Sequence, residues 1–207
     1  MSFSPIETKK ITENIYAIKD NMVNAYIYRD KENIIGIDCG VDKDIIACQL
    51  KSLNINPNSI SHVFLTHSHH NSAEAMQLFN NAVVYMSVNE DMISYHDKNI
   101  NRSCVLLKDG ESINIGSISV KAISTPGHTV GSMCYLVNEA YLFTGDTLSI
   151  HHGIVRPFFS LPNMNTQMQK QSLKKLAKLK HISMLFTTHT GYTEDFPDAI
   201  KSWKRKN

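Results

Sequence analysis

Residues 63–72 read Val-Phe-Leu-Thr-His-Ser-His-His-Asn-Ser, and the rest of the chain is arranged around them. The apolar run that opens this stretch predicts a buried strand, so residues 66–72 form the turn at its carboxyl end. His67 and His69 are two positions apart, and an extended backbone therefore points both imidazoles to the same side. Two imidazoles that converge from one short loop are half of a transition-metal site.

The whole chain has 207 residues, of which 42% are hydrophobic, and a formal net charge of +2. This length fits one domain, expected to span residues 1–207, and so small a charge gives no reason to expect nucleic acid. No apolar run approaches the length of a membrane span, and the first residues lack the apolar core of a signal peptide. The four cysteines form no Cys-x-x-Cys pair and are expected to be buried free thiols. We therefore expect a cytoplasmic protein without membrane association.

Short apolar runs separated by turn residues predict many strands, and longer patterns with helical spacing predict a few helices. Residues 151–162 have no clear period and are expected to form a long loop. Asn71 and Glu74 have the spacing of a capping box at the start of a helix over residues 72–79. Each half of the chain begins with strands and ends with helices, which favours two sheets back to back with helices outside. The helices are expected at residues 42–53, 72–79, 89–95, 165–179 and 195–203, with Asp42 able to cap the first of them.

Three further apolar runs also end in a residue that can bind a metal. His128 follows a Thr-Pro-Gly turn, Asp146 follows a Thr-Gly turn, and His189 follows the last predicted strand. A single histidine is more often structural than a ligand, but repeated placement at strand ends favours a shared site. Three neutral imidazoles and a carboxylate suit zinc, and would also hold iron(II) or manganese.

These motifs, in this order, resemble the metallo-β-lactamase superfamily. The signature of that family is Thr-His-x-His-x-Asp-His after a strand, then a Pro-Gly-His turn, a Gly-Asp turn and a late histidine. The corresponding segments here are residues 66–72, 126–128, 145–146 and His189, so the resemblance covers nearly the whole chain. It implies an α+β fold, a four-layer αββα sandwich with the metals at the rim between the sheets. It also makes a homodimer plausible.

The match is broken at Asn71 and Ser72, where the family has aspartate and histidine. The resemblance implies a first metal position formed by His67, His69 and His128, with Asp146 bridging to a second position. The second position would use residues 71 and 72, Asp146 and His189, and two of these ligands are lost. An amide carries no charge and binds zinc weakly, so the second site is expected to be weakened, with one zinc ion bound, or two at most. Helix capping is the favoured interpretation of Asn71.

The first functional hypothesis is a metal-dependent hydrolase of a small-molecule ester, thioester or lactam. Zinc held by three histidines lowers the pKa of its water to about 7, with Asp146 orienting that water and His189 carrying a proton. One alternative is a mono-iron enzyme similar to the persulfide dioxygenases, although their Gly-Cys-Gly-Arg-like segment has no counterpart here. Another is a catalytically impaired homologue that only binds a metal or ligand. The residues that bind substrate are not identified, because Phe158, Phe159 and Tyr192 are interpreted as core aromatics.

Overall fold

The computed structural model describes residues 3–90, 104–158 and 163–204, and for Asn71 only the backbone. The first sheet has seven strands in chain order, which come from the first half of the chain. Its central strands run parallel, so their carboxyl ends meet at one edge. The strands are β1 (Lys9–Lys10), β2 (Ile15–Asp20), β3 (Val23–Asp30), β4 (Asn33–Ile37), β5 (His62–Phe64), β6 (Val83–Ser87) and β7 (Val105–Leu107).

The second sheet has six strands in the order β15-β14-β11-β10-β9-β8, and β12 and β13 form a separate hairpin. Only the β11–β14 pair of this sheet is parallel, which places the ends of those two strands side by side. The strands are β8 (Ser112–Ile115), β9 (Ile118–Ser124), β10 (Met133–Val137), β11 (Tyr141–Phe143), β12 (Leu148–His151), β13 (Ile154–Pro157), β14 (Met184–Phe186) and β15 (Tyr192–Thr193).

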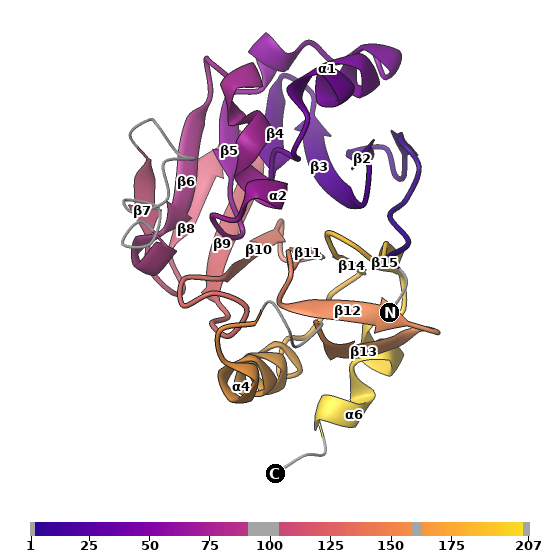
Figure 1. Ribbon diagram of the computed structural model, residues 1–207, viewed down its shortest axis with the longest axis vertical. Coiled ribbons are helices and arrows are strands. Elements are labelled where there is room, and N and C mark those ends of the chain that lie inside the picture. The colour runs from indigo at the N-terminus through magenta and orange to yellow at the C-terminus, as the bar shows by residue number, and fades with distance from the viewer. Residues whose placement is uncertain (1–2, 91–103, 159–162, 205–207) are drawn as a thin grey trace.

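The helices cover the outer faces of the two sheets (Figure 1). Those on the first sheet are α1 (Lys43–Ser52), α2 (His70–Ala73) and the short 3₁₀ helices η1 (Pro57–Ser59) and η2 (Glu74–Leu78). Those on the second sheet are α4 (Thr166–Leu176), α5 (Phe196–Ala199) and α6 (Lys201–Lys204). The predicted four-layer αββα sandwich is therefore confirmed. None of the helices in the described part of the chain has the length and apolar character needed to span a bilayer.

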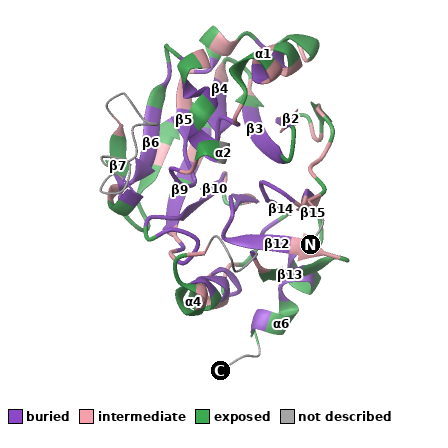
Figure 2. Cartoon of the chain, viewed as in Figure 1, coloured by how far each residue is buried: buried purple, intermediate pink, exposed green. Residues whose placement is uncertain are grey.

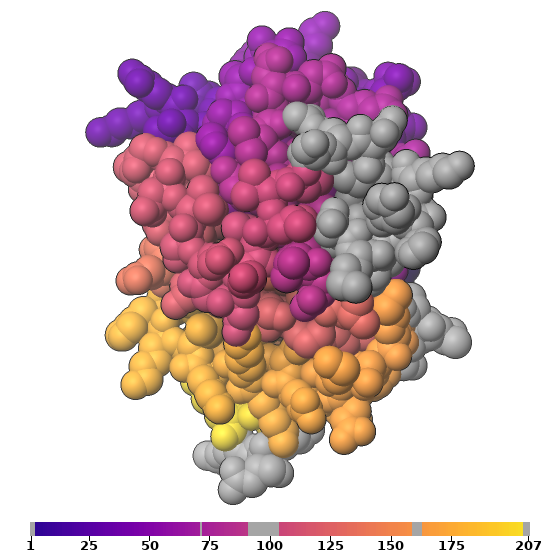
Figure 3. Space-filling view, turned by 90° about the vertical axis from the view of Figure 1, so that its left-hand side faces the viewer, coloured from indigo at the N-terminus to yellow at the C-terminus, as the bar shows by residue number. Residues whose placement is uncertain are grey.

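Alternating side chains explain why the sheets are buried on both faces. On β3, Tyr26 and Tyr28 pack between the sheets, whereas Ala25 and Ile27 pack under the helices of the first sheet. The strand β10 alternates in the same way between the central core and the core beneath α4. Figure 2 shows the result, with buried strands in the interior and exposed residues on the outward faces of α1, α4 and α6. Figure 3 shows the two halves of the chain stacked, with the N-terminal part at the top and the C-terminal part at the bottom.

Several local predictions are confirmed and others are wrong. Asp42 caps α1 as predicted, accepting hydrogen bonds from the backbone N–H groups of Asp44 and Ile45. The capping box at Asn71 is wrong, because His69 is the residue that precedes the first turn of α2. The loop expected over residues 151–162 is wrong in its first half, where β12 and β13 form a hairpin. The helix expected over residues 89–95 lies mostly outside the described residues. Cys48 is exposed rather than buried.

Candidate metal centre

The loop after β5 carries His67 and His69 into the edge where the two sheets meet. Val63, Phe64 and Leu65 are fully buried, which fixes the strand that precedes the loop. Thr66 then anchors the loop to the neighbouring strand, because its backbone N–H and its hydroxyl both donate to the carboxylate of Asp38 at the end of β4. The predicted strand and histidine turn are confirmed.

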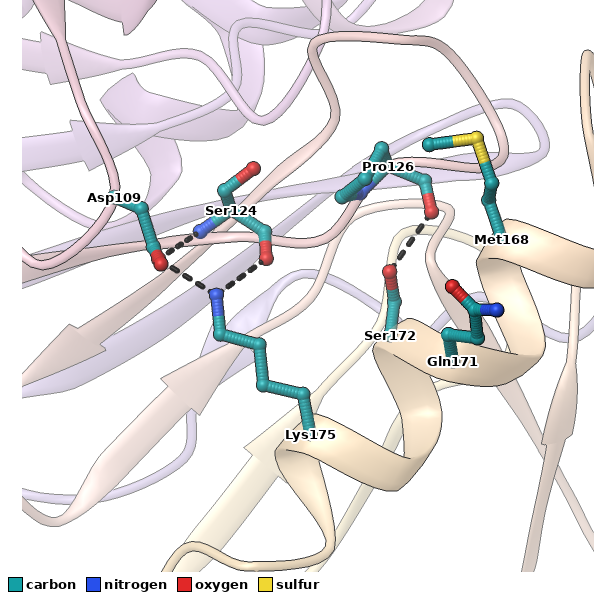
Figure 4. Close-up of a pocket in the computed structure, with 7 residues that line it drawn as sticks. All are labelled: Asp109, Ser124, Pro126, Met168, Gln171, Ser172 and Lys175. Atoms are coloured by element: carbon teal, nitrogen blue, oxygen red, sulfur yellow. Dashed lines mark hydrogen bonds and ion pairs between the residues drawn. The ribbon is translucent and has the colours of Figure 1, made fainter.

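The turn between β9 and β10 supplies His128, and α4 supports it from outside. The backbone N–H of Met164 donates to the carbonyl of His128 at 3.0 Å. A cavity of about 320 Å³ lies behind this turn. Ser172 Oγ donates there to the carbonyl of Pro126 at 2.8 Å (Figure 4). Lys175 Nζ donates to Asp109 Oδ1 and to the carbonyl of Ser124 in the same cavity. These polar groups form hydrogen bonds with one another across the cavity. They hold the His128 turn against α4.

Asp146 and His189 meet because β11 and β14 are parallel neighbours. Asp146 follows β11 through Gly145, which has a φ of +53°. A Cβ atom on Gly145 would lie 2.3 Å from Thr66 Oγ1, so only glycine fits this close approach. The Asp146 turn is thereby held against the loop that carries His67.

The side chains of these four turns converge. His69 Nδ1 lies 3.0 Å from His128 Nε2, and the ligand atoms of His67, His69 and His128 all lie within 4.8 Å of one another. Asp146 Oδ2 lies 3.6 Å from Nε2 of His67 and 3.4 Å from Nε2 of both His128 and His189. The structure therefore brings together all five residues that the sequence predicted.

The chemistry of the donors fits zinc. Zinc–nitrogen distances of about 2.0–2.1 Å in a tetrahedral site place donor atoms roughly 3.3 Å apart, close to the spacing seen between His69 and His128. His67 Nε2 is buried and makes no hydrogen bond within the described part of the chain, which is unusual for a buried ring nitrogen unless a metal takes its lone pair.

Hydrogen bonds at the far ring nitrogens set the orientation of three imidazoles. His67 Nδ1 lies 3.0 Å from Thr66 Oγ1, and His128 Nδ1 lies 2.9 Å from Asn163 Oδ1. His189 Nδ1 lies 2.7 Å from the carbonyl oxygen of Met22, in the turn between β2 and β3. A carbonyl oxygen can only accept, so His128 and His189 carry their protons on Nδ1 when neutral and turn Nε2 toward the centre.

Burial and mutual charge perturb the ionisation of the site. Burial lowers the pKa of His67 to about 3, so this imidazole is neutral and able to bind a metal at ordinary pH. Burial alone would raise the pKa of Asp146, but its hydrogen bond with His189 and the positive charge of that ring outweigh burial and lower it. Burial would lower the pKa of His189, and the same contact with Asp146 raises it. The pair therefore favours an ionised Asp146 carboxylate beside a protonated His189 imidazole.

Asp38 is a buried carboxyl group that the sequence motifs did not assign to the site. It accepts the Thr66 hydroxyl, which in turn lies beside His67 Nδ1. Burial raises its pKa to about 7, against the lowering effect of the two hydrogen bonds from Thr66. Aspartate at the end of a strand was visible in the sequence, but its partner became evident only from the pairing of β4 with β5.

Among the described side chains, those at or near the positions that depart from the family signature do not join the converging ligands. Ser72 is buried and its Oγ lies 3.3 Å from His67 Nδ1, on the side of the ring opposite Nε2. The side chain of Asn71 lies outside the described residues. His70 is 61% exposed and pairs with Glu74 at 3.1 Å, so this imidazole does not replace a lost ligand. His151 ends β12 and His152 lies exposed in the following turn; neither joins the converging histidines among the described residues.

Two aromatic rings lie against His189, and one of them also meets His128. The ring of Phe3 stacks on His189 with centroids 4.4 Å apart, and Phe158 stacks on His189 at 5.1 Å. Phe158 also meets His128 edge to face at 5.5 Å. Phe158 is buried as expected of a core aromatic and also contacts the site, and Tyr192 packs partly buried against the core between the sheets. Phe159 lies outside the described residues.

Comparison with known proteins gives the family. A sequence model of the metallo-beta-lactamase superfamily matches residues 18–189. The chain belongs to this superfamily. A protein of Bacillus velezensis named probable polyketide biosynthesis zinc-dependent hydrolase BaeB is 35% identical over 147 residues, which are 66% of this chain and 62% of that protein. A hydroxyacylglutathione hydrolase of Bartonella henselae is 36% identical over 132 residues, 61% of this chain and 47% of the relative. The matches thus span about half to two thirds of these relatives.

Solved structures show the same fold at low sequence identity. A metallo-beta-lactamase family protein from Thermus thermophilus has a TM-score of 0.72 at 17% identity, with 94% of this chain and 79% of that chain covered. A B3 metallo-beta-lactamase with an active-site glutamic acid has a TM-score of 0.74 at 20% identity, covering 97% of this chain and 87% of the other. The superfamily's fold therefore persists in this chain although Asn71 and Ser72 replace part of its signature.

Proposed function

We propose that the protein is a metal-dependent hydrolase of a small molecule with an ester, thioester or lactam-type bond. The convergence of the His67, His69 and His128 imidazoles, with the Asp146 carboxylate beside two of them, carries this proposal. The names of the relatives support it, since one is a probable zinc-dependent hydrolase and another a hydroxyacylglutathione hydrolase. Of the three bond types, a thioester agrees best with the latter name.

His67, His69 and His128 would hold the metal, and zinc is the ion that these donors suit best. A bound zinc would supply a Lewis acid and hydroxide at neutral pH. Asp146 lies within 3.6 Å of three imidazole nitrogens and stays ionised beside them, so its carboxylate can accept a hydrogen bond from the attacking water and orient it. His189, whose pKa the contact with Asp146 raises, would take up the proton released by the water and deliver it to the leaving group. The rings of Phe3 and Phe158 limit the access of bulk water to this pair.

The second metal position is proposed to be weak. Its two remaining ligands would be Asp146 and His189, and the hydroxyl of Ser72 is engaged with the far side of His67. Hydrolysis would then depend on the first ion. The same observation favours a second candidate function, a catalytically impaired homologue that binds a metal or ligand without turnover.

One experiment tests the hydrolase and separates it from the impaired homologue. Zinc-loaded protein is assayed against a hydroxyacyl thioester of glutathione, an aryl acetate and a β-lactam. We expect turnover of at least one substrate, which is lost in His69→Ala. Activity that arises only after Asn71→Asp combined with Ser72→His would identify the impaired homologue, and no activity in either protein would refute the hydrolase.

A further inference from the structure

Glu90 is a buried carboxylate that lies between the two loops supplying the candidate ligands. It follows β6 by three residues and is fully buried. Its Oε1 atom accepts hydrogen bonds from the backbone N–H of Ser68 at 2.7 Å and from the Ser68 hydroxyl at 2.8 Å. Its Oε2 atom accepts from the hydroxyl of Thr129 at 2.8 Å. One side chain therefore joins the residue between His67 and His69 to the residue after His128.

This connection runs from one sheet to the other. Ser68 belongs to the loop after β5 in the first sheet, while Thr129 belongs to the β9–β10 turn of the second. The turn packs tightly against Glu90, since a Cβ atom on Gly131 would lie 2.3 Å from its backbone nitrogen and 2.4 Å from its Oε2 atom. Metal ligands must be held to within roughly 0.5 Å, and loops need outer contacts to reach that accuracy. Glu90 supplies such contacts to both loops that carry the three histidines, through Ser68 and Thr129.

The charge of Glu90 is also informative. A buried carboxylate is costly unless it is paired with a cation or fully hydrogen-bonded. Within the part of the chain that the structure describes, Glu90 forms no ion pair, and its three hydrogen bonds all go to the histidine loops. These three hydrogen bonds of the carboxylate therefore stabilise the two loops of the metal centre. They do not stabilise a helix or a strand.

We propose that Glu90 is a positioning residue for the metal centre, which acts by locking the His67–His69 loop against the His128 turn. This inference rests on the proposed metal binding by these histidines. It predicts that loss of the carboxylate spreads the three ligands and weakens zinc binding, although Glu90 itself touches neither metal nor substrate.

The test compares Glu90→Ala with Glu90→Gln. Alanine leaves the Ser68 backbone N–H unpaired and separates the loops, so zinc affinity should fall about 10- to 100-fold, the usual cost of losing an outer-shell partner. Glutamine can keep both links: its carbonyl accepts from Ser68, and its amide donates to Thr129, whose hydroxyl then turns to Ser132 Oγ 2.7 Å away. We expect Glu90→Gln to recover most of the affinity. Affinity is measured by chelator competition, and the cobalt(II) visible spectrum reports ligand geometry.

Asp20 provides a matched control, because it is equally buried and accepts the backbone N–H groups of Val41 and Asp42 away from the histidine loops. Asp20→Ala should lower the thermal midpoint yet leave zinc affinity and the cobalt spectrum as in the wild type. If Glu90→Ala does not fold, Thr129→Val cuts the same link at its other end and should also alter the cobalt spectrum.

Two results are decisive. Wild-type affinity and an unchanged cobalt spectrum in folded Glu90→Ala, or in Thr129→Val where the alanine variant does not fold, would overturn the positioning role. A wild-type protein that binds neither zinc nor cobalt would instead refute the proposed metal centre on which this role rests.

Discussion

The close contact between Gly145 and Thr66 makes a sharp prediction for Gly145→Ala. The new methyl group would lie 2.3 Å from Thr66 Oγ1 and 2.6 Å from Thr66 Cβ. Thr66 cannot rotate away without breaking its hydrogen bonds to Asp38 and its contact with His67 Nδ1. Left-handed backbone costs alanine about 1 kcal/mol and overpacking adds about 1–3 kcal/mol, so unfolding free energy should fall by about 2–4 kcal/mol. Because His67 moves with Thr66, zinc affinity should also fall about 10-fold or more.

Gly153→Ala is the matched control. Gly153 has a φ of +73°, similar to the +53° of Gly145, but no atom lies within 4 Å of its Cβ position. It should therefore cost only the backbone term of about 1 kcal/mol and leave zinc affinity unchanged. The assay is urea unfolding of metal-free protein, followed by zinc titration against a competing chelator. Equal losses of stability in the two variants, with equal zinc affinity, would refute the steric argument.

Three further predictions concern the ligands and their partners. His69→Ala should weaken zinc binding by more than the roughly 10- to 100-fold cost of losing an outer-shell partner. His70→Ala should leave zinc binding unchanged, because this imidazole is exposed. Equal effects of the two variants in chelator competition would show that the ligand assignment is wrong. Asn163→Ala removes the acceptor for His128 Nδ1 and should weaken zinc binding about 10-fold, which is contradicted by wild-type affinity. Asp38, with Asp146 and His189 nearby, has its folded pKa raised to about 7, so metal-free wild type should lose stability relative to Asp38→Asn as pH rises from about 4 to 7. Urea unfolding at several pH values measures the stability of wild type minus that of Asp38→Asn. A value that stays constant or grows as pH rises would refute the prediction.

Local patterns explain why the histidine turns were predictable from the sequence. Val63, Phe64 and Leu65 end in a cluster of histidines, and both the strand and the turn follow from that contrast of residue types. The likeness of the four motifs to one family then supplied the order of layers, which no single motif determines. Asp42 was predictable for the same local reason, since a helix cap involves residues only a few positions apart.

Contacts between distant segments explain what the sequence did not reveal. Glu90 and Asn163 lie in no motif, and their contacts with the histidine loops form only because the segments after β6 and before α4 pack beside those loops. Asn71 was assigned to a capping box, but the helix starts earlier because His69 already ends the extended loop. The β12–β13 hairpin did have a sequence signal, because a glycine as the second residue of the His152-Gly153 pair is typical of a two-residue hairpin turn. The structure gives both residues the positive φ values of such a turn.

The measurement that tests the account most directly is a count of metal ions per chain in protein purified without chelator or added metal. About one zinc per chain is expected, lost in His69→Ala, because three imidazoles suffice to hold one ion. About two zinc ions per chain would contradict the weakened second site at Asn71 and Ser72. No bound metal, even after incubation with zinc, would contradict the metal centre itself.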